Sequence, residues 1–148
     1  MADQILRIIP ADPDFVPGNA DQQMAMALFS SFVLKADKIN VIADDEIRFV
    51  DPGEKWEGVT CPVCGADLND WIQEAIGTAY ENGFQDLTIT TPCCGSVGSL
   101  NDLVYAPPAG FSRFILEAVN PVRDLSDMQI EFLKGTLKCD LRKVWAQY

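Results

Sequence analysis

Two short cysteine phrases constrain this chain more than any other feature of its sequence. CPVCG occupies residues 61–65, and TTPCCG follows about 30 residues later, at residues 90–95. Each phrase contains a proline beside its first cysteine and a glycine after its last one. Proline fixes part of a tight turn, and glycine permits a positive φ, which lets backbone N–H groups face sulfur. The repetition predicts two turns that present their thiols to a common centre.

The first phrase has the spacing of a metal-binding turn. A C-x-x-C turn can point two sulfurs at one centre, and Zn²⁺ binds cysteine thiolates in a tetrahedral array. The alternative is a thioredoxin-like redox pair, which lies at the N-terminus of a helix. Because a helix is expected to begin near Asp67, Cys61 and Cys64 alone leave both interpretations open.

The second phrase has to be interpreted together with the first. Adjacent residues of an extended chain point to opposite faces, so Cys93 and Cys94 reach one ion only if the chain turns sharply there. Gly95 permits such a turn. If only one of the pair binds, Cys139, an aspartate or water is left to complete the site. We predict a four-sulfur zinc site with the ligands Cys61, Cys64, Cys93 and Cys94.

The two phrases resemble the paired knuckles of zinc-ribbon and rubredoxin-like sites. The wider text, with CPVCG, PCCG, SLNDLVY and PPAGF in order, resembles a family of small uncharacterised bacterial proteins. The resemblance covers residues 45–148. It implies that Cys61 and Cys64 are ligands, and it implies no biochemical activity. The adjacent Cys93 and Cys94 depart from the C-x-x-C that is usual in a second knuckle.

The composition excludes several classes of enzyme. The chain of 148 residues contains no histidine, so it has no Ser-His-Asp triad, no Cys-His pair and no HExxH zinc site. A closed four-sulfur site leaves no coordination position at which water could be activated. We therefore expect a non-enzymatic binding or adaptor protein that structural zinc stabilises.

An enzyme that uses carboxylates is the alternative. Asp44, Asp45 and Glu46 form one cluster, and an LND sequence occurs twice. If both LND sequences flanked the metal, a shared pocket would be lined by Asn69, Asp70, Asn101 and Asp102. Asparagine and aspartate also commonly cap helices and turns, so each of these residues has a structural interpretation as well.

The charge of the chain bears on its partners. Eleven basic and 22 acidic residues give a net charge of −11, which disfavours nucleic acid and favours a basic protein partner, if there is one. No apolar run is long enough to cross a bilayer, and the N-terminus lacks the basic start of a signal peptide. We expect a cytoplasmic protein, and five cysteines in such a protein argue against a disulfide framework.

Hydrophobic periodicity predicts an α+β fold with a mostly antiparallel sheet and about three helices. Strands are expected at residues 4–9, 38–42, 46–50, 87–91, 113–119 and 141–148. Helices are expected from Asn19 to near Lys35, from about Asp67 to Gly83 and from Ser126 to Leu137. The order at the two ends predicts two βαβ halves of ferredoxin-like type. Residues 51–111 would then be a zinc-ribbon-like insertion within a single domain, 1–148.

Particular side chains carry finer predictions. Asn19 with Gln22, and Ser126 with Gln129, have the spacing of helix capping boxes. Asp67 or Asn69 is expected to cap the central helix. Core positions are expected for Trp71, Tyr80, Tyr105 and Phe111.

Overall fold

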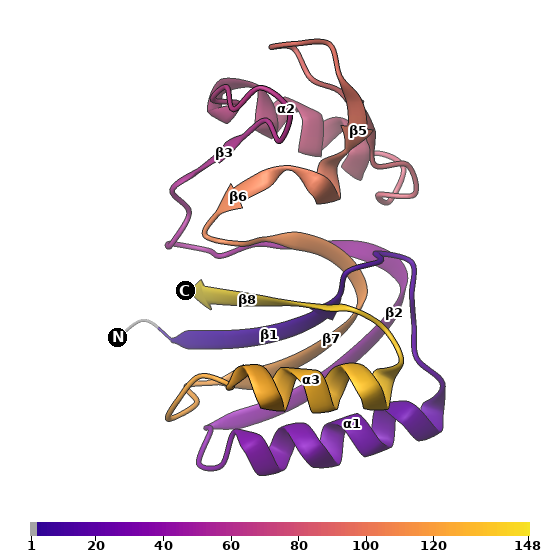
Figure 1. Ribbon diagram of the computed structural model, residues 1–148, viewed down its shortest axis with the longest axis vertical. Helices are drawn as coiled ribbons and strands as arrows, with labels where there is room; N and C mark the ends of the chain where they lie inside the picture. The colour runs from indigo at the N-terminus through magenta and orange to yellow at the C-terminus, as the bar shows by residue number, and fades with distance from the viewer. Residues whose placement is uncertain (1–2) are drawn as a thin grey trace.

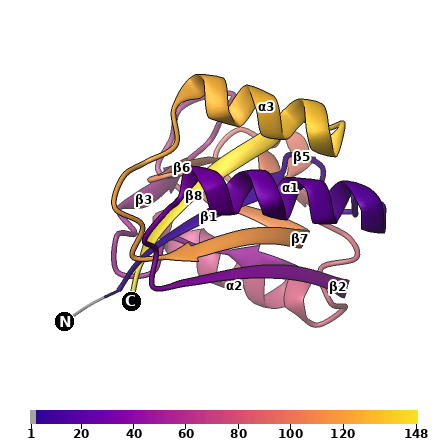
Figure 2. The ribbon, with the colours of Figure 1, turned by 90° about the horizontal axis from the view of Figure 1, so that it is seen from below.

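A four-stranded sheet with two helices on one face makes up one half of the molecule (Figure 1). The computed structural model describes residues 3–148. The strand order is β2-β7-β1-β8, and every neighbouring pair is antiparallel. The strands are β1 (Gln4–Pro10), β2 (Lys38–Val50), β7 (Gly110–Val119) and β8 (Leu141–Gln147). Seen from below, α1 (Asn19–Phe32) and α3 (Asp127–Leu137) lie beside each other across the sheet (Figure 2).

The predicted α+β class is confirmed. The described residues contain three α-helices and a mostly antiparallel arrangement of strands, with α2 (Asn69–Tyr80) as the third helix. Each end of the chain runs strand, helix, strand, and the strands of the two ends alternate across the sheet. The ferredoxin-like description stays a prediction that this alternation favours.

The face of the sheet under the two helices forms one hydrophobic core. Alternate residues of a strand point to the same face, so β1 contributes Leu6 and Ile8 while β7 contributes Phe114 and Leu116. Phe29 of α1 packs against them and is fully buried. Burial of a side chain of this size stabilises the fold by about 1.5–3 kcal/mol.

The two predicted capping boxes have different outcomes. At α3 the Ser126 side chain accepts a hydrogen bond from the Gln129 amide at 3.2 Å, and the Gln129 side chain accepts one from the Ser126 amide at 2.9 Å. At α1 the prediction is wrong, because the N-cap is Gly18 and no side chain caps the helix. Asn19 already lies inside the first turn, and the Gln22 side chain donates instead to the Pro17 carbonyl.

The prediction of two short strands around Asp44 and Asp45 is also wrong. Residues 38–50 form one strand, β2, whose two parts pair with β7 in the same direction. Ala43 lies opposite Phe114 and Arg48 lies opposite Ser112, so the four residues between Ala43 and Arg48 face only one residue of β7. This large β-bulge pushes residues 44–47 away from the sheet, which is a known role of bulges.

The chain between β2 and β7, residues 51–109, lies on the side of the sheet away from α1 and α3 (Figure 1). We call it the knuckle segment. Besides α2 it contains β3 (Gly58–Thr60), β4 (Thr88–Thr90), β5 (Val97–Ser99), the 3-10 helix η1 (Leu100–Asp102) and β6 (Val104–Ala106). β3 pairs with β6, and β4 pairs with β5.

The knuckle segment has a hydrophobic core separate from that of the helix-covered face. Ile72 of α2, Phe84 and Leu100 are buried there, together with Ile47 from the bulge and Phe111 from β7. The bulge therefore joins the sheet to the knuckle segment. Tyr105 and Phe111 are buried, as expected. Of the helices within residues 3–148, none has the length and the hydropathy that crossing a bilayer requires.

Candidate metal centre

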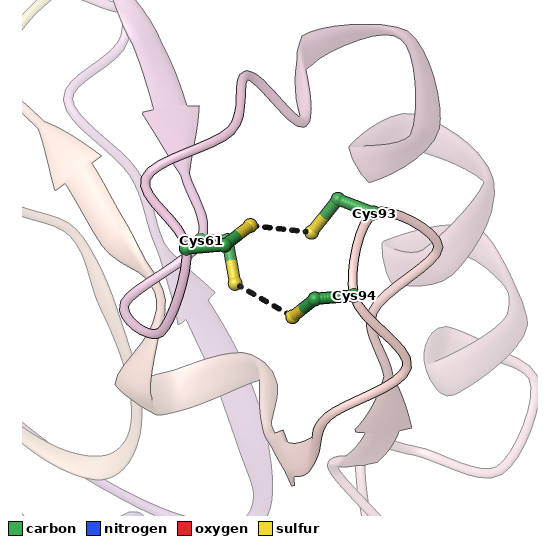
Figure 3. A group of neighbouring side chains, drawn as sticks. Cys61, Cys93 and Cys94 are labelled. Atoms are coloured by element: carbon green, nitrogen blue, oxygen red, sulfur yellow. Dashed lines mark hydrogen bonds between the residues drawn. The ribbon is translucent and has the colours of Figure 1, made fainter.

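Four sulfur atoms converge from the tips of two turns. The Sγ atoms of Cys61, Cys64, Cys93 and Cys94 all lie within 4.8 Å of one another. Figure 3 shows Cys93 and Cys94 pointing toward the turn that carries Cys61. The Sγ atoms of Cys61 and Cys94 are 3.8 Å apart, and those of Cys64 and Cys93 are 3.3 Å apart. Sulfurs bound at about 2.3 Å to a tetrahedral ion lie roughly 3.8 Å apart, so the cluster is compatible with a structural metal site.

The two turns, residues 61–66 and 91–96, close in the same way. In each, the N–H of the fifth residue donates to the carbonyl of the first at 2.9 Å, and the N–H of the first donates to the carbonyl of the sixth at 2.9 Å. The fifth residue is Gly65 or Gly95, with φ of 76° and 72° respectively. Such a φ favours glycine, which explains why each phrase ends in this residue.

The equivalence of the two turns explains the unusual second phrase. Position by position, the turns pair Cys61 with Thr91, Val63 with Cys93 and Cys64 with Cys94. Thr91 thus occupies the position that Cys61 has in the first turn. The second turn has no sulfur at that position, and its second thiol is that of Cys93, two residues later. The Thr91 hydroxyl still faces the cluster, with its Oγ1 3.4 Å from the Sγ of Cys94.

Hydroxyl groups surround the sulfur of Cys94. Its Sγ lies 3.1 Å from the Oγ of Ser96 and 3.4 Å from the Oγ1 of Thr91. Hydrogen bonds from Ser96 and then from Thr91 lower the pKa of Cys94 to about 6. A thiol with such a pKa is largely a thiolate at neutral pH, which is the form that binds metal.

The pKa values of the two thiols in the first turn, Cys61 and Cys64, are shifted in opposite directions. A hydrogen bond from the Cys64 amide lowers the pKa of Cys61, and the amide of Val63 also donates to its Sγ, at 3.4 Å. The Ala66 amide acts to lower the pKa of Cys64, but hydrogen bonding to the neighbouring sulfurs, that of Cys93 first, outweighs it and raises the pKa to about 12. Thiols this close cannot all ionise unless a positive ion lies between them.

The cluster is accessible from solvent. Cys61 is buried, whereas Cys64, Cys93 and Cys94 are exposed and all five cysteines are free thiols. A disulfide requires sulfurs about 2.0 Å apart, so the 3.3 Å between Cys64 and Cys93 separates two thiols. Cys139 packs at the edge of the core under the helices, and it is not a member of the cluster.

The two LND sequences do not form a shared pocket. The Oδ1 of Asn69 accepts a hydrogen bond from the Val59 amide at 2.8 Å, and the Oδ1 of Asn101 accepts one from the Phe111 amide at 3.0 Å. Both asparagines thus support the backbone. Asp102 lines a small cavity of about 50 Å³ beside Cys61, which Asn69, Asp70 and Asn101 do not line.

Near α2 the structure confirms part of what the sequence predicts. Trp71 is half-buried against the core, but the prediction that Tyr80 is a core residue is wrong, since it is 70% exposed. Neither Asp67 nor Asn69 is the N-cap of α2, which is Leu68. Asp67 nevertheless accepts a hydrogen bond from the Asn69 amide at 2.7 Å, at the start of the helix.

Comparison with known protein families, with characterised proteins and with solved structures finds no match. A fold alone does not define a function, so the evidence for function comes from the site. The fold and the site together define an α+β protein with a four-cysteine cluster that is compatible with a structural metal.

Proposed function

We propose that this is a non-enzymatic binding protein whose knuckle segment is held together by one Zn²⁺. The observation that carries the proposal is the convergence of four sulfurs within 4.8 Å, from two turns of equal backbone geometry. A tetrahedral four-sulfur set is typical of zinc or of iron–sulfur chemistry. The resemblance of the two phrases to zinc-ribbon knuckles favours zinc. The ligands are Cys61, Cys64, Cys93 and Cys94.

The ion would act as a cross-link. It would join the turn between β3 and α2 to the turn between β4 and β5, whose strands belong to separate two-stranded sheets. Structural zinc contributes roughly 10–16 kcal/mol of apparent binding free energy in small peptides. A domain has a net stability of about 5–15 kcal/mol, so even part of that contribution decides whether the knuckle segment folds.

The charge distribution supports a basic protein as the partner. The knuckle segment carries nine acidic residues and one basic residue, a net charge of −8 out of the −11 of the whole chain. A field of one sign speeds association with an oppositely charged partner. Free thiolates and zinc also suit a reducing compartment, and we therefore place the protein in the cytoplasm.

Metal content of cysteine variants tests the proposal. We expect one zinc ion per chain in the wild type by native mass spectrometry, and loss of the ion together with a lower melting temperature in Cys64→Ser. The matched control is Cys139→Ser, which changes a thiol outside the cluster and should keep the ion. Purified, reduced wild-type protein without metal would refute the zinc site.

A thiol redox protein is the second candidate. It is favoured by the exposure of Cys64 and Cys93 and by the 3.3 Å between their sulfurs, which a small movement would close to a disulfide. The same mass spectra distinguish the two functions. Metal-free protein that is lighter by two or four protons would support redox chemistry, and zinc-loaded protein with intact thiols would support the structural ion.

A further inference from the structure

A groove lies between the β2 bulge and α2, on the seam between the sheet and the knuckle segment. Its volume is about 620 Å³, within the range of roughly 300–1,000 Å³ that is usual for binding sites. The bulge supplies one wall with residues 44–49, and the last two turns of α2 supply the other with residues 73–80. The bulge creates this wall, because in a regular strand these residues would stay in the sheet.

The floor of the groove is apolar and aromatic. Ile47 and Phe84 are 7% and 5% exposed, and Phe49 and Ile76 pack beside them. Tyr80 stands at the edge, 70% exposed, with its ring 5.7 Å from that of Phe84 in an edge-on arrangement. A large aromatic side chain left in water above an apolar floor is typical of a contact site.

The rim of the groove is negative. Arg48 donates from its Nε to the Oδ2 of Asp44 at 2.8 Å, so its charge is compensated. Glu46 also lines the groove, and none of the ion pairs among residues 3–148 involves it. The wall formed by α2 is the C-terminal half of that helix, and its last turn carries no basic residue. The C-terminal end of a helix dipole favours cations.

We infer that this groove binds a segment of a partner protein in which a lysine or arginine adjoins a large apolar side chain. The apolar side chain would cover Ile47 and Phe84, and the cation would pair with Glu46 beside the end of α2. Tyr80 would contact both, since its ring is apolar and its face attracts cations. The inference names the partner class of the proposed binding protein, and it rests on that proposal.

Gly77 makes the groove testable without damage to the fold. It lies in the helical wall, it is exposed, and a Cβ built on it meets no atom within 4 Å. A tryptophan there would occupy the groove. Gly135 of α3 is a matched control, since it is also helical, exposed and without a neighbour within 4 Å of its Cβ position. Both sites accept a side chain, and only Gly77 faces the groove.

The probe is a set of capped hexapeptides in which tryptophan or leucine is flanked by arginine and lysine, with glutamate-flanked versions as controls. We expect the basic peptides to cause saturable amide shifts in residues 44–49 and 73–84, and the acidic peptides to cause none. Glu46→Gln should weaken binding about tenfold. Gly77→Trp should abolish binding, and Gly135→Trp should leave it unchanged.

Four outcomes would overturn the inference. The first three are shifts that lie outside the groove, binding that survives Gly77→Trp, and no saturable shift with any basic peptide. A fourth is equal binding of phenethylamine, because the groove would then take a small organic cation and not a protein segment. Zinc content is measured on the same samples. Zinc-loaded protein that binds no peptide would refute the groove inference and leave the zinc proposal standing, whereas metal-free protein would refute the zinc proposal.

Discussion

Arg142 of β8 and Asn101 of η1 connect the sheet to the knuckle segment through two hydrogen bonds. The Nη1 of Arg142 donates to the backbone carbonyl of Asn101 at 3.0 Å and to its Oδ1 at 3.1 Å. Asn101 in turn accepts from the Phe111 amide and donates to the Ala11 carbonyl at 2.9 Å. One buried amide side chain thus joins four parts of the chain, and every one of its partners belongs to the protein itself.

Asn101→Ala should be strongly destabilising. It removes three side-chain hydrogen bonds and leaves the buried Phe111 amide without its acceptor, which we expect to cost about 3 kcal/mol of unfolding free energy. Asp102→Asn is the matched control, because Asp102 is exposed and should change stability by less than about 0.5 kcal/mol. Urea denaturation measures the unfolding free energy of both variants. Equally small losses of stability in the two would contradict a structural role for the Asn101 side chain.

Exchange of two residues should rebuild the second turn in the form of the first. Cys93→Val alone should lose the ion, since one sulfur is missing. Thr91→Cys together with Cys93→Val should regain it, because residue 91 is equivalent to Cys61 and its side chain already faces Cys94. Zinc stoichiometry measures the outcome. A double variant as poor in zinc as the single one would show that the two turns are not equivalent as ligand carriers.

Gly110→Ala should be destabilising. A Cβ at this position would lie 2.8 Å from the Nη1 of Arg142, which two backbone carbonyls hold, and 2.9 Å from the Cδ1 of the buried Ile9. Overpacking of this kind costs about 1–3 kcal/mol. Gly77→Ala is the control, and it should stabilise the protein by about 0.5–1 kcal/mol, because alanine favours a helix and the site is open. Thermal melts measure both variants, and the melting temperature should fall for Gly110→Ala and rise for Gly77→Ala.

The ion pair between Arg7 and Glu117, on the face of the sheet away from α1 and α3, should make stability depend on pH. Burial alone would raise the pKa of Glu117, but hydrogen bonds from Arg7 and Asn40, each at 2.9 Å, outweigh it and hold the pKa below its ordinary value of 4.5. The unfolded chain therefore binds the proton more tightly. The stabilisation is fully present above about pH 4.5 and is lost as the pH falls through the folded pKa.

Glu117→Gln isolates this contribution from acid release of the metal. Both proteins lose the ion at low pH, so only the difference between their unfolding free energies reports on Glu117. We expect the wild type to be more stable by about 1.5–3 kcal/mol near pH 7, and the difference to shrink below pH 4.5. A difference that stays constant from pH 7 to pH 3 would contradict the assigned pKa direction.

Features with a local cause could be predicted from the sequence. The two turns depend on Gly65 and Gly95, and the cap of α3 depends on Ser126 and Gln129, so each is fixed by residues within six positions. Strands β1 and β7 follow from short runs of isoleucine, leucine and phenylalanine, most of which are buried. These are short-range effects of backbone and side-chain chemistry.

Features that depend on a distant partner could not be predicted. The bulge in β2 is defined by its register with β7, about 65 residues later, and Asp44-Asp45 alone suggests a turn. Tyr80 follows the apolar stripe of α2 but lies at its edge, where no element covers it. The role of Thr91 emerges only when the two turns are compared in three dimensions.

Thermal unfolding with and without chelator tests the zinc cross-link most directly. We expect the reduced protein to carry one zinc ion, and exhaustive chelation to lower the melting temperature and to remove hydrogen-exchange protection in residues 51–109 first. Protein that binds no metal as purified, and that melts as cooperatively and at the same temperature after chelation, would contradict the zinc cross-link.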